Sequence, residues 1–274
     1  MIFFENQKKR LRALCQQYSD IDEVQIVSNL LETSARWRVM IDVGAHCGES
    51  LGCFVEKGWS AHGFEPDAQN FKNLEEKWGA FPNVHLNRLA VAASDEKGAA
   101  FFPSRENSYI GSLAPFDPSH SARPDRVDVI KLATYCREHA IPGADFLKID
   151  TEGYDLFVLK GVPWEQMHPE VILCEYENRK TEPLGYSVDD LAACLLGHGY
   201  RIMVSEWLPI IQYSGPFRWR RFEEWRPGLV DPAGNGNLIA IRDPALFNRL
   251  KFLCRKRAFR KRVLDFLRTL YSRL

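Results

Sequence analysis

Carboxylates follow three separate apolar segments of this 274-residue chain. Asp42 and Glu65 end the first two segments, and Asp150 and Glu152 end a later one. When apolar segments form parallel strands, their carboxyl ends meet at one edge of the sheet, where ligands bind. The sequence therefore predicts an acidic site at that edge, suited to hydroxyls and to positively charged groups.

A glycine turn follows the first segment, in the order Asp42, Gly44, Ala45, Gly48. Glycine lets the backbone approach a ligand, and the N–H groups of a following helix bind polar groups. The G-x-G-x-x-G pattern of NAD-binding turns is absent, and Asp42 would repel a pyrophosphate but suits an ammonium group. These features favour S-adenosylmethionine over NAD, with a turn that binds no ligand as the alternative.

Glu65 lies about 20 residues after the glycines, the usual distance to an acid that binds the ribose hydroxyls. Pro66 would fix the turn into the next helix. The alternative is a carboxylate that only interacts with the dipole of that helix.

Three charges alternate in "FLKIDTEG", so Lys148, Asp150 and Glu152 share one face if this segment is a strand. Such charges are costly unless they contact substrate, water or one another. Asp150 or Glu152 could accept a hydroxyl proton, while Lys148 orients them. Glu175 repeats the pattern after a later apolar run. A local ion-pair network is the alternative.

Helical and apolar segments alternate through most of the chain, which predicts an α/β fold with a mostly parallel sheet and helices on both faces. We expect strands at 38–44, 60–66, 84–92, 144–153, 170–177, 201–207 and 236–243, and a hairpin-like segment at 98–104. Helices are expected at 4–34, 48–58, 68–79, 128–140, 154–162 and 187–199, with a break in the first near residues 19–20.

The ordered motifs DVGAHCG, FEP, LKIDTEG with VLKG, and PEVILCEYE resemble the FkbM family of S-adenosylmethionine-dependent methyltransferases. The resemblance covers about residues 39–177, and the later strands fit the same fold. It implies a Rossmann-like class I methyltransferase with a seven-stranded sheet whose last strand is antiparallel. It also implies methyl transfer to a hydroxyl oxygen of a sugar, glycan or natural-product intermediate.

The resemblance also assigns roles to residues by position. The cofactor-binding set is Asp42, Gly44, Ala45, Gly48, Glu65, Pro66, Ser112 and Asp150. The catalytic set is Asp150, Glu152 and Lys148, with His46 in the cofactor turn as a further candidate base. A divalent metal is possible, but the spacing does not require one, so we expect no metal ligands.

A segment rich in aromatic residues and arginine, within 206–236, precedes the last strand. Aromatic rings stack on sugars and arginines bind phosphate, so this insertion could recognise the acceptor. The expected substrate residues are Glu175, Trp207, Tyr213, Trp219, Arg220 and Arg221. An insertion packed by its own aromatic side chains is the alternative.

Charge is distributed unevenly between the C-terminal tail and the rest. The chain has 36 bases and 36 acids, but residues 245–274 hold ten bases and one acid, so the tail is near +9 and the rest near −9. We expect an N-terminal helical segment at 1–36, a methyltransferase domain at 37–244 and a basic amphipathic helical tail at 245–274. The tail suggests peripheral contact with a membrane surface, packing on the acidic body or contact with a partner chain.

The seven cysteines are an odd number and are scattered along the chain, which favours free thiols in a reducing cytoplasm. We therefore expect a cytoplasmic protein, and the basic tail suggests peripheral contact with the inner membrane surface. No nucleic-acid-binding module is recognisable, and a homodimer is possible. The sequence thus predicts a methyltransferase, most simply an O-methyltransferase. The alternatives are a non-catalytic scaffold protein of the same fold and, less favoured, an NAD-dependent oxidoreductase.

Overall fold

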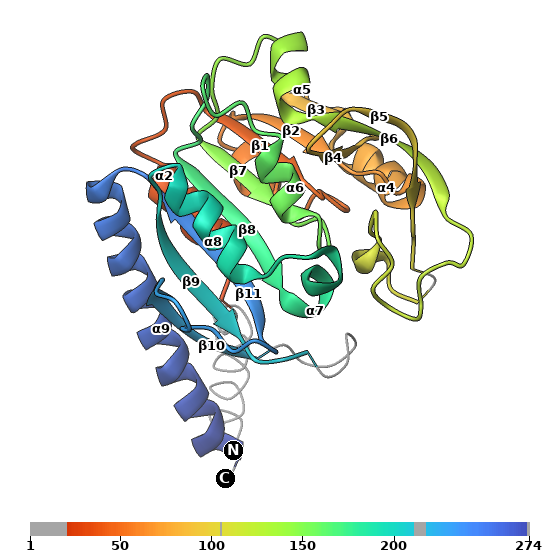
Figure 1. Ribbon diagram of the computed structural model, residues 1–274. Coiled ribbons are helices and arrows are strands. Elements are labelled where there is room, and N and C mark those ends of the chain that lie inside the picture. Colours follow the sequence, from red (N-terminus) through yellow and green to blue (C-terminus); the bar gives the residue numbers. More distant parts are fainter. Residues whose placement is uncertain (1–20, 105, 211–217, 273–274) are drawn as a thin grey trace, which may run out of the picture.

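The computed structural model describes residues 21–104, 106–210 and 218–272. Its centre is a sheet of eight strands (Figure 1). The strand order is β10-β9-β11-β8-β7-β1-β2-β3. The strands are β1 (Val39–Val43), β2 (Ser60–Phe64), β3 (Val84–Asn87), β7 (Phe146–Ile149), β8 (Val171–Glu177), β9 (Arg201–Trp207), β10 (Trp219–Glu224) and β11 (Asn235–Ile241). β11 runs antiparallel to β8 and β9, and β10 runs antiparallel to β9.

The α/β fold and the antiparallel last strand are as predicted, but the sheet has one strand more than expected. The additional strand is β10, which comes from the segment expected to be an insertion and pairs with β9 at the sheet edge. Its sequence, WRRFEE, has too few apolar residues to be recognised as a strand. Pairing with β9 provides the hydrogen-bonding partners that the local pattern does not reveal.

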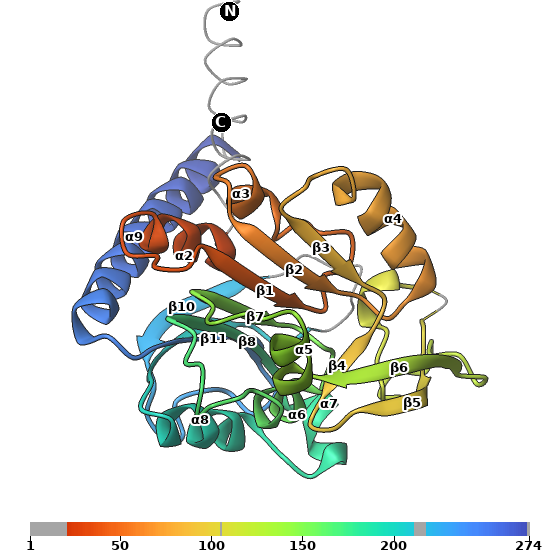
Figure 2. The same ribbon diagram turned by 90° about the horizontal axis from the view of Figure 1, so that it is seen from above.

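Helices cover both faces of the sheet, which gives three layers (Figure 2). One face packs against α5 (Leu132–Glu138), α6 (Asp155–Lys160) and α8 (Val188–Gly197). The opposite face packs against α2 (Glu23–Leu31), α3 (Gly52–Val55), α4 (Ala68–Trp78) and α9 (Pro244–Ser272). Three short helices, η1 (Ser108–Ile110), α7 (Asn178–Thr181) and η2 (Glu182–Leu184), lie in the connections.

A second sheet contains β4 (Ala90–Ala92), β6 (Asp125–Lys131) and β5 (Glu96–Phe101), in that order. It corrects two predictions. Residues 84–92 form two strands in different sheets, and the helix expected at 128–140 is a strand followed by the shorter α5. Residues 128–131 form a strand because they pair with β4 and β5, which lie some 30 to 40 positions earlier in the chain. A local sequence pattern does not reveal such distant pairing.

Helices α2 and α9 contribute to the core on one face of the sheet. Leu246, Phe247, Leu250 and Cys254 of α9 are buried in the same apolar cluster as the residues of α2. The expected helical structure before residue 21 lies outside the described residues, and the three proposed segment boundaries stay predictions. No helix among the described residues is both long enough and apolar enough to cross a bilayer.

The cysteine prediction concerns Cys15 and six other residues. The six within the described part of the chain are all free thiols, at positions 47, 53, 136, 174, 194 and 254. Cys15 lies outside that part.

Candidate active site

A cleft opens at the carboxyl ends of β1, β2 and β7. The turn after β1 contributes Gly44 and His46, the turn after β2 contributes Glu65 and Pro66, and Asp150 follows β7. In the sheet order, β2 lies on one side of β1 and β7 on the other. This is the topological switch point at which parallel α/β sheets bind ligands.

The lining of the cleft combines acidic and apolar side chains. Leu89, Val91 and Phe101 contribute apolar surface, whereas the strand-end carboxylates contribute charge. A ligand with a flat apolar group, hydroxyls and a positive charge therefore matches the chemistry of the cleft.

Gly44 brings the turn after β1 against the end of β7. Its φ is +81°, and an added Cβ would lie 1.8 Å from the carbonyl oxygen of Asp150. The N–H groups of Gly44 and Ala45 donate to the carbonyl oxygen of Phe64 at 3.0 and 2.9 Å. Ala45 is buried, and Gly48 packs against Trp78, so these two residues shape the turn without lining the cleft.

Lys148 joins two of the predicted carboxylates. Asp42 and Lys148 are paired in register on neighbouring strands, and Nζ of Lys148 lies 3.2 Å from Oδ1 of Asp42 and 3.3 Å from Oδ2 of Asp150. Burial alone would lower the pKa of Lys148, but the two carboxylates raise it, so the ammonium stays charged.

Asp42 is fully buried behind the cleft rather than on its surface. Its other oxygen accepts a hydrogen bond from the hydroxyl of Ser50. The contacts of Asp42 therefore support the position of Lys148, and direct contact between Asp42 and a ligand stays a prediction.

Glu65 is oriented by the backbone of two turns. Its carboxylate accepts hydrogen bonds from the N–H groups of His46 at 2.8 Å and Asp67 at 2.9 Å. Burial raises the pKa of Glu65 to about 7, even though both hydrogen bonds favour the ionised form. A ligand that donates hydroxyl groups would add to the stabilisation of the carboxylate.

Lys180 of α7 belongs to the site, although its sequence context did not predict this. Its ammonium lies 2.6 Å from Glu152, 2.9 Å from Glu175 and 3.1 Å from Glu177, and only 1% of the side chain is exposed. Glu177 and Lys180 are three positions apart, a spacing at which an acid and a base can pair on a helix, so the sequence does predict this one contact. The contact with Glu152 joins two different strand ends and is visible only in the folded chain.

The acids around Lys180 differ in protonation. Burial raises the pKa of Glu152 to about 7, although the nearby Lys180 lowers it. Burial also raises the pKa of Asp155, to about 6. Burial would also raise the pKa of Asp150, but Lys148 and Lys180 lower it overall. The site thus combines an ionised carboxylate, Asp150, with one that titrates near neutral pH, Glu152.

The loop before β6 forms one wall of the cleft. His46 stacks on Tyr109 with ring centroids 4.1 Å apart, and its Nε2 lies 3.1 Å from the hydroxyl oxygen of Ser108. Asn70 of α4 donates to the carbonyl oxygen of Ser108 at 2.9 Å. Ser112, predicted from the same loop, lines the cleft and donates to the carbonyl oxygen of Glu152 at 2.8 Å. Asn70, Ser108 and Tyr109 were not among the predicted site residues.

Of the residues expected to bind substrate, Trp207, Trp219, Arg220 and Arg221 do not line this cleft. Nε1 of Trp207 donates to Glu23 at 3.1 Å, and Nε1 of Trp219 donates to Ser205 at 3.2 Å. These contacts hold β10 and α2 against β9. Tyr213 lies outside the described residues.

Arg220 and Arg221 pair with the fully buried Glu206, at 3.2 and 2.7 Å. The two arginines thereby neutralise a carboxylate inside the protein. Of the expected substrate residues that the structure describes, Glu175 alone belongs to the acid cluster beside the cleft.

Carboxylate oxygens of Asp150, Glu152 and Glu175 lie within 4.8 Å of one another, close enough to share a divalent ion. Lys180 already contacts Glu152 and Glu175. A metal at this position would therefore compete with a buried ammonium group for the same oxygens.

The strand order from β3 to β9, with the antiparallel β11 between the parallel strands β8 and β9, is that of class I S-adenosylmethionine-dependent methyltransferases, and β10 is added at the edge. The model of the methyltransferase FkbM domain matches residues 42–202, which is more than half of the chain. The protein belongs to the FkbM methyltransferase family. Membership implies S-adenosylmethionine as cofactor, and the acidic and apolar lining of the cleft suits the chemistry of this molecule.

Solved structures resemble the chain only distantly. A methyltransferase FkbM from Methylobacillus flagellatus is 19% identical with a TM-score of 0.43, over 78% of this chain and 47% of that chain. A precorrin-6y C5,15-methyltransferase from Geobacter metallireducens is 14% identical with a TM-score of 0.42, over 80% and 86% of the two chains. No curated protein matches the chain.

Proposed function

We propose that this protein is an O-methyltransferase that methylates a hydroxyl of a sugar, a glycan or a natural-product intermediate. The observation that carries the proposal is Glu152, a carboxyl group at the cleft with a pKa of about 7. An alcohol is a weak nucleophile until its proton is removed, and a base that titrates near neutral pH is well matched to that task.

When bound, S-adenosylmethionine supplies a methyl group activated by a sulfonium. Glu152 would accept the proton of the acceptor hydroxyl, whose oxygen would take the methyl group while the methyl–sulfur bond breaks and leaves neutral S-adenosylhomocysteine. Lys180 holds the Glu152 side chain, and Ser112 holds its backbone carbonyl oxygen. Alignment of the acceptor oxygen accounts for much of the expected acceleration.

Two other carboxylates have binding roles in this proposal. Glu65, which two backbone N–H groups orient toward the cleft, accepts hydrogen bonds from the ribose hydroxyls. Asp150, kept ionised by Lys148, faces the positive charge of the methionine portion. Glu76, an exposed acid of α4, pairs with Lys72 and does not line the cleft.

Calorimetric titration with S-adenosylhomocysteine tests the cofactor assignment. We expect micromolar binding, no binding of NAD, and at least about tenfold weaker binding by Glu65→Ala, because two ribose hydrogen bonds are lost. Glu76→Ala removes an exposed acid of α4 and should leave the affinity unchanged. Failure of the folded protein to bind S-adenosylhomocysteine would contradict the proposal and favour a non-catalytic scaffold, whereas binding of NAD would favour an oxidoreductase.

Transfer of a labelled methyl group to a panel of sugars, nucleotide sugars and matched amino sugars tests the acceptor class. We expect label on hydroxyl oxygen, a loss of at least about 100-fold in kcat for Glu152→Gln, and unchanged affinity for S-adenosylhomocysteine. A metal chelator should leave the rate unchanged, because Lys180 supplies the positive charge in the acid cluster. Label found only on nitrogen would refute O-methylation.

A further inference from the structure

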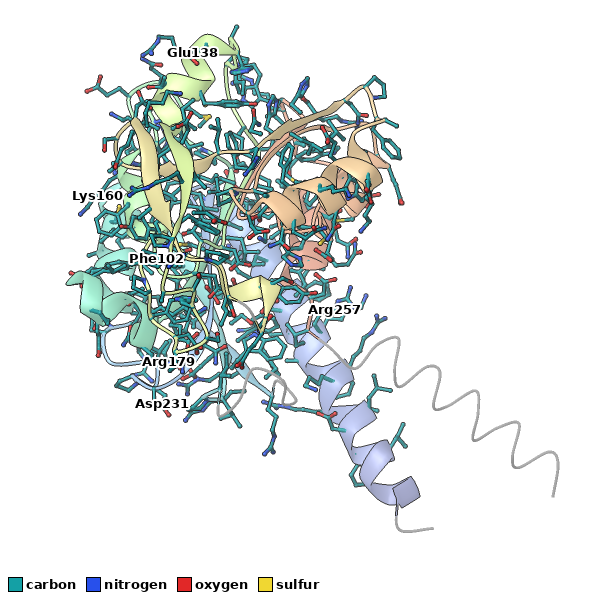
Figure 3. All side chains as sticks on the ribbon, turned by 90° about the vertical axis from the view of Figure 1, so that its right-hand side faces the viewer. Phe102, Glu138, Lys160, Arg179, Asp231 and Arg257 are labelled. Atoms are coloured by element: carbon teal, nitrogen blue, oxygen red, sulfur yellow. The ribbon has the colours of Figure 1, made fainter. Side chains whose placement is uncertain are left out.

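Helix α9 is longer than the sheet on which it packs. Its 29 residues span about 43 Å, whereas the seven residues of β11 span about 23 Å. The helix begins after β11, which runs antiparallel to the other long strands, so it runs toward the edge that holds the cleft. It leaves the body of the molecule near Arg257 (Figure 3).

The two sides of α9 differ in their contacts. One side carries the buried residues of the core, from Leu246 to Cys254. The other side carries the stripe, which we define as Phe252, Phe259, Val263 and Phe266. These four side chains are 66%, 68%, 41% and 67% exposed.

The stripe is continuous along the helix. The three phenylalanines are seven positions apart, which is close to two full turns, and Val263 lies between the last two on the same side. Four large apolar side chains in one exposed line are unusual on a protein surface and mark an interaction site.

Positive charges border the stripe on both sides. Successive residues of a helix are rotated by about 100° about its axis. By this rotation, Arg255 and Arg262 lie within about 60° of the stripe on one side. Lys256 and Arg260 lie within about 100° of it on the other side. All four side chains are exposed. Apolar residues between two basic rows are typical of helices that lie in the interface of an anionic membrane.

We propose that the stripe of α9 docks this protein on an anionic lipid surface, with the phenylalanines in the acyl boundary and the bases on the headgroups. Charge decides against pairing with the same stripe of a second copy, because that contact would bring eight bases together. A lipid surface instead provides both the apolar layer and the negative charge. The inference does not depend on the proposed reaction.

Vesicle co-sedimentation of the full-length protein tests the proposal. We expect binding to vesicles in which about a third of the lipid is phosphatidylglycerol, little binding to pure phosphatidylcholine, and weakening by salt. Phe259→Asp with Phe266→Asp should reduce binding at least about tenfold, and Arg255→Glu with Arg262→Glu should do the same.

Leu196→Asp is the matched control, because Leu196 is an exposed apolar residue of α8 on the opposite face of the sheet. It should bind vesicles like the wild type. Every variant should also retain the wild-type unfolding temperature and affinity for S-adenosylhomocysteine, which separates this test from that of the reaction. Absence of vesicle binding by the wild type, or equal binding by the Phe259 and Phe266 double variant, would overturn the proposal. A dimer that the same double variant dissociates, without vesicle binding, would assign the stripe to a second copy instead.

Discussion

Lys180 places one buried ammonium group among the carboxylates of Glu152, Glu175 and Glu177. Removing one partner from a buried charge network leaves the others uncompensated, which costs far more than losing a surface ion pair. Lys180 is therefore important for the stability of the site as well as for the orientation of Glu152.

We expect Lys180→Met to lower the free energy of unfolding by about 3 kcal/mol near pH 8, because the uncompensated carboxylates repel one another. The loss should be smaller near pH 5.5, where Glu152, whose pKa is already raised to about 7, takes up a proton. Urea denaturation at the two pH values measures both effects. A loss that is equal at the two values would contradict the explanation.

The exposed pair of Lys97 and Asp128 provides the control for Lys180. Its atoms lie 2.8 Å apart, as close as the contacts of Lys180, but 88% of the Lys97 side chain is exposed. Lys97→Met should change the stability very little, because water screens the pair.

At the scale of elements, the turn between β1 and α3 decides whether the cleft exists. Gly44 combines a φ of +81° with close contact to the backbone of Asp150. Side chains disfavour this φ, and the carbonyl oxygen of Asp150 occupies the space that a Cβ would need. The ends of β1 and β7 therefore approach each other more closely than any residue other than glycine would permit at position 44.

Gly44→Ala should weaken binding of S-adenosylhomocysteine by at least about tenfold, because the turn and Asp150 must move apart. Gly58→Ala is the matched control, since Gly58 has a φ of +76° but no atom within 4 Å of an added Cβ. That change should cost about 1 kcal/mol of stability and leave the affinity unchanged. Calorimetry and thermal unfolding of both variants give the comparison, and equal affinities for the two variants would refute the steric argument.

At the scale of the whole molecule, buried carboxyl groups link stability to pH. The pKa values of Glu65 and Glu152 rise from 4.5 to about 7, so the folded state holds protons that the unfolded chain releases. The stability from these groups is therefore lost as pH rises through about 7. His62 acts in the opposite direction, but only below about pH 6.5, because burial lowers its pKa from 6.5 to about 4.

We expect the unfolding free energy of the ligand-free protein to fall by about 1.5 kcal/mol between about pH 6.5 and 8. Glu65→Gln cannot titrate and should remove about half of this fall, while Glu76→Gln, an exposed acid, should leave it unchanged. Urea denaturation across this pH range is the measurement. Stability that rises over the range would show that the two carboxyl groups are not protonated in the folded state.

The sequence by itself determined the class of fold, the glycine turn and the strand-end positions of Glu65, Asp150 and Glu152. These features depend on local patterns, because an apolar run specifies a buried strand and the residues after it must lie at the edge of the sheet. The same motifs supported the family, which the match over residues 42–202 confirmed.

Only the tertiary structure decided the contacts between segments that are distant in the chain. It placed Lys180 against Glu152, brought Ser108 and Tyr109 to the cleft, extended residues 128–131 into β6, and paired Arg220 and Arg221 with Glu206. The physical reason is that a charged or aromatic side chain has no preferred partner in a local pattern. Its partner depends on which strands and loops the packed core brings together, and that information is spread over the whole chain.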